Sequence, residues 1–157
     1  ISQISETLFI LTIPFFLHRF GIKKVMLMSM IAWVLRFGLF AIGNPGAGFP
    51  FLIMSMIIYG MAFDFFNISG SLFVEIESKP KIRASAQGLF MIMTNGLGAY
   101  IGGMGSGYVI DYFTNNGIIN WPGAWFTFAA YALVVGIAFM FLFKYKHDPT
   151  VLAKVKH

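Results

Sequence analysis

Long apolar stretches alternate with short polar segments along this sequence. An α-helix rises about 1.5 Å per residue, so about 20 apolar residues cross a hydrocarbon layer of about 30 Å. Within each stretch the apolar residues follow one another directly, which favours transmembrane helices over the alternating strands of a β-barrel. The pattern predicts an all-α membrane protein with a tail at 144–157 and five transmembrane helices, at residues 1–17, 24–42, 50–74, 86–111 and 123–143.

The composition agrees with this class of protein, and the positions of the charges add a topology. Hydrophobic residues make up 58% of the chain and charged residues 11%, against about 25% charged residues in a typical soluble domain. The segments 43–49 and 112–122 contain no Lys or Arg. The basic residues occupy the other links and the tail: His18, Arg19, Lys23, Lys24, Lys79, Lys81, Arg83, Lys144, Lys146, Lys154 and Lys156.

Basic residues in every second link are typical of the positive-inside rule with an odd number of spans. We therefore expect residue 1 on the outer side of the membrane and the C-terminus in the cytoplasm. The net charge of +5 is explained by this topology, and a nucleic acid partner is not expected.

The remaining chemistry-bearing residues give no enzyme or metal signature. The chain has no Cys, which excludes disulfides and thiolate metal sites. The histidines His18, His147 and His157 have no acidic partners at ligand spacing, so neither a metal nor another cofactor is expected. The sequence lacks an initiating Met and starts inside an apolar stretch, and we expect it to continue upstream of Ile1.

Three charged residues fall near the middle of predicted spans. Counted from the cytoplasmic end of its helix, each of Glu6, Arg36 and Asp64 lies about 16 to 18 Å into the membrane. A charge at this depth costs about 2.5 to 3.5 kcal/mol on insertion scales. Two interpretations remove that cost for all three residues: a buried ion pair that fixes helix packing, with Arg36 as its main candidate, or a shared wet cavity. The long side chain of Arg36 could also reach out to the external loop.

Polar and aromatic companions favour the cavity for the two acids. At about 100° per residue, Tyr59, Phe63 and Asn67 step around one sector of their helix, next to Asp64. Gln3 and Glu6 are three residues apart and share a face. Aromatic rings beside amides and carboxylates suit a flat polar solute, and a carboxylate in a low dielectric can carry a proton.

Small residues in the stretch 86–111 indicate close helix packing. The segment "GLGAYIGGMGSG" places Gly98 four residues before Gly102, and Gly103 four before Gly107, a spacing that lets helices approach. Pro14 permits bending of the first predicted helix.

Four segments resemble known transporters. "FLHRFGIKKVMLMS" resembles the basic loop signature of major facilitator transporters, although His18 stands where the signature usually has Asp. "SQISETLFILTIPFFL", "YGMAFDFFNISGSLFVE" and "RASAQGLFMIMTNG" resemble the C-terminal half of the bacterial nucleoside:proton symporters. The resemblance implies helices eight to twelve of a twelve-helix protein of the inner membrane, a partial C-terminal half of the major facilitator fold without its N-terminal half.

The resemblance also implies roles for individual residues. Gln3 and Glu6 would hydrogen-bond the ribose or base, and Tyr59 and Phe63 would hold the ring of the nucleoside. Asp64 or Glu6 would carry the coupling proton, and Asn67 is a further binding candidate from its position. The implied partners are the nucleoside, a proton, the lipid bilayer and the other half of the transporter, which would work by alternating access.

Three other functions fit the residues. One is a proton symporter for sugars or another polar solute, because rings and carboxylates also bind pyranosides. Another is a membrane-embedded enzyme with Glu6 and Asp64 as acid and base. The last is a structural membrane subunit whose charges only pair.

Overall fold

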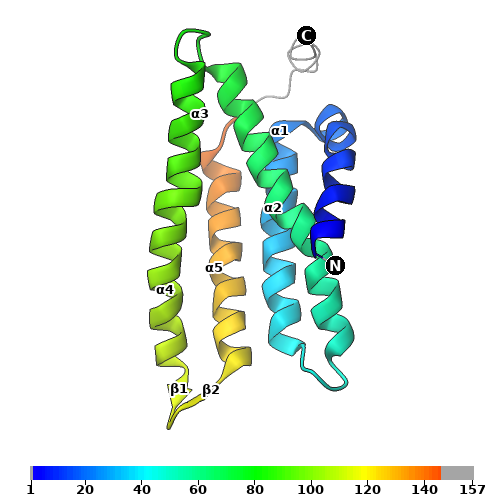
Figure 1. Cartoon of the computed structure of the whole chain (residues 1–157), viewed down its shortest axis with the longest axis vertical. Helices are drawn as coiled ribbons and strands as arrows, with labels where there is room; N and C mark the ends of the chain where they lie inside the picture. The colour runs from blue at the N-terminus through cyan, green and yellow to red at the C-terminus, as the bar shows by residue number, and fades with distance from the viewer. Residues whose placement is uncertain (1, 146–157) are drawn as a thin grey trace.

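The structure, a computed structural model, describes residues 2–145 and is dominated by long helices arranged side by side (Figure 1). Along the chain the elements are α1 (Ser2–Ile42), α2 (Phe49–Glu77), α3 (Arg83–Met91), η1 (Ile92–Gly98), α4 (Ala99–Tyr112), β1 (Thr114–Asn115), β2 (Ile118–Ile119) and α5 (Trp121–Leu142). Of the described helices, α1, α2 and α5 are each long and apolar enough to cross a membrane. The prediction of an all-α membrane protein is confirmed in this coarse form.

Helix α1 consists of two parts that meet at Gly21. The backbone there is non-helical, with φ 79° and ψ 166°, a conformation that glycine adopts without steric cost. Figure 1 shows the chain turning back at this point, so that the two parts lie side by side. The predicted spans 1–17 and 24–42 fall in these two parts. Pro14, where bending was expected, lies inside the first part, and the helix is interrupted at Gly21 instead.

The predicted span 86–111 lies in a helix that continues from α3 through η1 into α4. Its middle section, Ile92–Gly98, is a π-helix, in which hydrogen bonds run from i to i+5. Hydropathy carries no signal for this change of winding, and the sequence did not predict it.

A short antiparallel hairpin joins α4 to α5, where only a loop was expected. Thr114 pairs with Ile119 and Asn115 with Ile118. Between the strands Asn116 has φ 50° and Gly117 has φ 78°, as a two-residue type I′ turn requires. The Asn-Gly dipeptide is the sequence signal for this turn.

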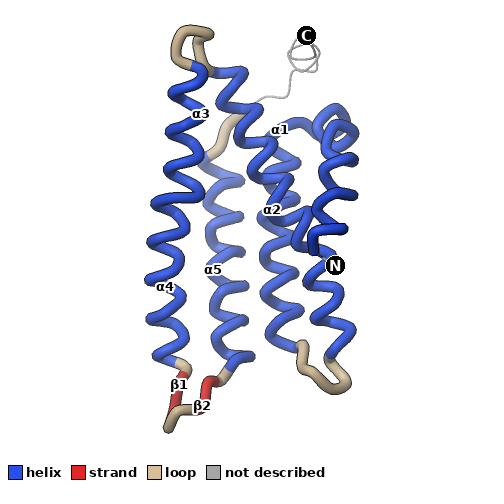
Figure 2. The backbone as a smooth tube through the Cα atoms, in the orientation of Figure 1, coloured by secondary structure: helices blue, strands red, loops and turns tan. Residues whose placement is uncertain are grey.

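The segments that link the helices lie at the two ends of the bundle (Figure 2). The turn at Gly21 and the loop 78–82 lie at one end, and the segment 43–48 and the hairpin lie at the other. Lys23 Nζ donates a hydrogen bond of 3.0 Å to the carbonyl oxygen of Met140, near the end of α5. The basic links therefore share one end, as the loop charges predicted. Lys146, Lys154 and Lys156 lie outside the described residues.

The buried core lies where both parts of α1 pack against α2. Its buried members are Ile13, Leu17, Ile22, Val25, Met26 and Phe65. Elsewhere large apolar side chains are exposed, for example Tyr112 and Leu142 at 81% each. Such a surface fits contact with lipid or with further protein.

The glycines of α4 do not make the close helix contacts expected of them within the described part of the chain. A Cβ atom built on Gly102, Gly103 or Gly107 would meet nothing within 4 Å. The tight approaches are elsewhere, above all at Gly60 of α2.

Candidate functional site

The candidate site is built where α2 crosses the first part of α1 at Gly60. A Cβ atom on Gly60 would lie 2.7 Å from the backbone nitrogen of Glu6 and 2.8 Å from Ser5 Oγ. The Ser5 hydroxyl donates a hydrogen bond to the carbonyl oxygen of Ile57, across the same crossing. Because only a glycine permits this approach, the crossing fixes Glu6 beside the next turn of α2.

That next turn carries Asp64, so the crossing brings the two predicted acids together. Asp64 is 8% exposed, and its Oδ2 is buried with no hydrogen-bond partner among the described residues. Glu6 is half-buried and close enough to act electrostatically on Asp64. Two carboxylates in one poorly solvated site repel each other when both are charged, and one bound proton relieves this repulsion.

An aromatic pair stands on the same stretch of α2. The rings of Tyr59 and Phe63 are stacked with centroids 5.7 Å apart and an interplanar angle of 24°. Phe63 remains 37% exposed and Tyr59 is half-buried. These rings therefore offer accessible aromatic surface beside the acids, as the helical spacing indicated.

The ion-pair interpretation of Arg36 is wrong for the described residues. Between 2 and 145 the ion pair that forms joins Arg83 to Glu75, and Arg36 contacts rings. Its guanidinium carbon lies 4.0 Å from the ring centroid of Tyr59 and 5.2 Å from that of Trp33. Trp33 was not among the residues predicted from the sequence, although its place three residues before Arg36 puts both on one face of α1.

The other two predicted binding residues lie less centrally. Gln3 is exposed on the first part of α1, and its carbonyl oxygen accepts a hydrogen bond from Thr7 Oγ1. Asn67 Nδ2 donates a hydrogen bond of 2.9 Å to the carbonyl oxygen of Phe63 on its own helix. This bond leaves the amide oxygen of Asn67 for any external donor.

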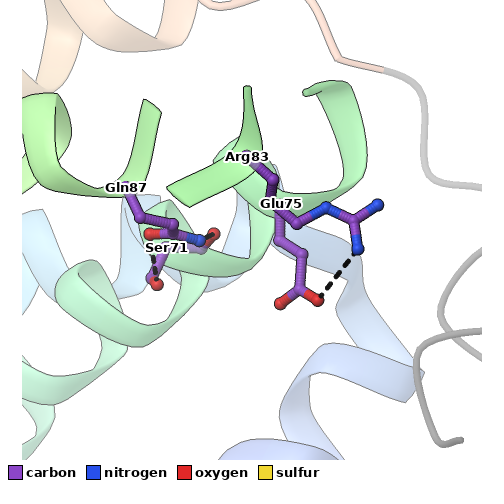
Figure 3. Close-up of polar contacts among 4 residues, drawn as sticks. All are labelled: Ser71, Glu75, Arg83 and Gln87. Atoms are coloured by element: carbon purple, nitrogen blue, oxygen red, sulfur yellow. Dashed lines mark hydrogen bonds and ion pairs between the residues drawn. The ribbon is translucent and has the colours of Figure 1, made fainter. Parts of the chain in front are cut away.

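A polar clamp joins α2 to α3 at the basic end of the bundle (Figure 3). Ser71 Oγ donates to Gln87 Oε1 at 2.9 Å, and Gln87 Nε2 donates to the carbonyl oxygen of Ser71 at 2.7 Å. One turn away, Arg83 Nη1 lies 3.7 Å from Glu75 Oε1. This clamp was not predicted from the sequence, since its signal is only a matching spacing of four residues on two helices.

Comparisons with known proteins give a consistent result. The family described as "Nucleoside H+ symporter" matches residues 1–148. Nucleoside permease NupG of Escherichia coli (strain K12) is 60% identical over 160 residues, which cover 100% of this chain and 38% of that protein. Xanthosine permease of the same organism is 60% identical over 158 residues, covering 37% of its length.

A solved structure agrees with the described fold. The crystal structure of nucleoside transporter NupG matches with a TM-score of 0.86 and 62% identity, over 92% of this chain and 36% of that one. The chain thus spans between 36% and 38% of the length of these relatives.

Proposed function

Since this chain belongs to the nucleoside H+ symporter family, we propose that it forms part of a transporter that imports nucleosides together with protons. In this proposal it crosses the bacterial inner membrane five times, with the two parts of α1, with α2, with α3–η1–α4 and with α5. The basic end of the bundle faces the cytoplasm, and residue 1 lies toward the periplasm. Support comes from the clustering of basic links at one end and from the alternating direction of the helices (Figure 1).

The observation that carries the proposal is the pair of acids at the Gly60 crossing, next to exposed aromatic surface. The crossing at Gly60 holds Glu6 and the turn that carries Asp64 on neighbouring helices, at a depth where charge is costly. A purely structural role predicts that acids at this depth are paired with a base, yet neither has an ion-pair partner among the described residues. Proton binding lowers this cost, because it neutralises one of the two carboxylates.

The coupling then follows from simple electrostatics. With no proton bound, the two carboxylates repel each other, and a proton taken from the outside neutralises one of them. A neutral carboxylic acid also donates a hydrogen bond, so Asp64 or Glu6 can present a donor that a charged pair lacks. Release of that proton to the cytoplasm restores the repulsion, and alternating access of the site to the two sides couples this cycle to solute movement.

The solute would be held by the residues around the acids. Tyr59 and Phe63 would stack against the base, because flat rings prefer offset-stacked contacts. Glu6 and Gln3 would accept or donate hydrogen bonds to ribose or base, and Asn67 would contribute its amide oxygen. The rest of the cavity wall would come from the N-terminal half of the transporter, a proposal supported by the 38% of NupG that the chain covers.

The test is uptake of labelled uridine by a full-length transporter that carries this segment. We expect uptake to fall to background with a protonophore, with Asp64→Asn and with Glu6→Gln. Glu75→Gln is the matched control, since Glu75 is an acid of α2 in a solvent-exposed ion pair, and it should leave uptake nearly unchanged. Uptake that survives all three treatments would refute proton coupling through these acids.

Competition separates this function from sugar transport. Unlabelled nucleosides should suppress uridine uptake, whereas pyranosides at the same concentrations should not. Suppression by sugars alone would make the protein a sugar symporter, and chemical conversion of uridine during entry would indicate an enzyme.

A further inference from the structure

The charge of Arg36 lies inside a cage of three aromatic rings. Its guanidinium carbon is 4.0 Å from the ring centroid of Tyr59, 5.2 Å from that of Trp33 and 5.5 Å from that of Phe40. Trp33 and Phe40 belong to the second part of α1, three residues before and four after Arg36, on the same face. Tyr59 comes from α2, so the cage closes only when these helices pack.

The cage is an unusual place for a cation. Nε and Nη1 of Arg36 are buried and have no hydrogen-bond partner among the described residues. Removing a charge from water is costly unless other interactions compensate, and here the compensation comes from the negative faces of the rings. Arginine suits this because its planar guanidinium is weakly hydrated and stacks on rings, which the ammonium of lysine does not.

The contact with Tyr59 is the shortest of the three and leads directly to the candidate site. Tyr59 also meets Trp33 edge-on, with centroids 6.1 Å apart and an interplanar angle of 85°, and stacks on Phe63. Its ring is thus bounded by a cation over one face and by two further rings. A ring held in this way keeps one orientation and offers a solute the part of its surface that Arg36, Trp33 and Phe63 leave uncovered.

We propose that Arg36 is a positioning residue for solute binding, which fixes the ring of Tyr59 without touching the solute. This inference rests on the proposed function, because it assigns Tyr59 to the solute site. It predicts an effect on the affinity for the nucleoside, whereas a residue that only supports folding would change the amount of working protein.

The experiment measures concentration-dependent uridine uptake by the full-length transporter carrying Arg36→Met or Arg36→Lys. Loss of a desolvated cation–π contact predicts that Arg36→Met raises KM about tenfold, with Vmax per transporter molecule largely kept. Arg36→Lys keeps the charge but not the planar stack, and a rise of about threefold is expected. Arg19→Met is the matched control, since Arg19 also lies over a ring, that of Phe20, at 5.8 Å. The KM of this variant transporter should not change.

A double-mutant cycle then tests whether Arg36 acts through Tyr59. In a Tyr59→Leu background the ring is gone, so Arg36→Met should raise KM by less than about twofold. A full tenfold rise in that background would mean that Arg36 acts independently of the ring, for instance by contacting the solute, and would overturn the proposal. An unchanged KM in the single variants, with fewer transporters in the membrane, would overturn it in favour of a structural role.

The outcomes also separate this inference from the proposed function. If the unmodified transporter takes up no nucleoside, the proposed function fails and the position of Arg36 has no bearing on that result. If it does take up uridine and the variants show unchanged KM, only the role of Arg36 is refuted. Should Arg36→Met not reach the membrane, Arg36→Lys alone and in the Tyr59→Leu background carries the same test.

Discussion

Replacing Gly60 by alanine is the sharpest perturbation of the acid pair that leaves both acids in place. The new Cβ would lie 2.7 Å from the backbone nitrogen of Glu6, whereas ordinary contacts of this kind begin at 3.4 Å. Since the obstacle is backbone on a neighbouring helix, no side-chain rotation relieves it. The two helices have to separate by about 0.7 Å, and overpacking of this kind costs about 1–3 kcal/mol.

The separation acts on the site in two ways. It lengthens the hydrogen bond from Ser5 to Ile57, which spans the same crossing, and it moves Glu6 away from Asp64. A misplacement approaching 1 Å costs up to about 100-fold where function depends on geometry. We expect the initial rate of uridine uptake by Gly60→Ala to fall at least about tenfold, a loss larger than the change in protein level.

The assay compares initial uptake rates in membrane vesicles, normalised to transporter content by immunoblotting. Gly102→Ala is the matched control, because Gly102 also lies inside a helix, α4, and its Cβ would meet nothing within 4 Å among residues 2–145. If Gly60→Ala and Gly102→Ala transport equally well, the helices do not approach at Gly60 as described, and the crossing does not place the acids.

Two further predictions concern other parts of the fold. Gly117 has φ 78°, a conformation that costs a β-branched residue about 1–2 kcal/mol. Gly117→Val should therefore lower the melting temperature of the purified transporter by a few degrees, and Gly117→Asn should lower it less, because asparagine tolerates this conformation. Equal effects of the two variants would contradict the turn. A Cβ on Gly70 would lie 2.6 Å from the ring of Phe90, so Gly70→Ala should destabilise the purified protein. Adding Phe90→Leu to this variant should recover part of the lost stability. A further loss of stability in the double variant would show that the ring does not fill that space.

The sequence predicted long apolar helices and a common level for Glu6 and Asp64, since both depend on patterns along each helix. Runs of apolar residues mark helices of membrane length, and equal depth placed Glu6 and Asp64 at one level. Neither signal says which faces touch. That information lies in the crossing at Gly60, where a missing side chain decides the distance between two helices.

The features that were missed depend on partners far apart in the chain or on backbone detail. Arg36 was the main candidate for an ion pair, and its contact with Tyr59 appears only once α1 and α2 are packed. The π-helical section leaves no trace in hydropathy, since its residues are as apolar as their neighbours. The hairpin at Asn116 and Gly117 did have a local signal, and a search for Asn-Gly turns would have found it.

The wider winding of η1 has a consequence for comparing sequences of this type. A π-helical section accommodates about one residue more than the α-helix it replaces, so it rotates everything after Gly98 by about 100° relative to Arg83–Met91. A relative that lacks one residue here and winds this section as an α-helix would therefore present the same side of α4 to its neighbours. A relative of equal length without the π-helical section would instead turn α4 by about 100°, so that other amino acids face the interior even where the letters align without a gap.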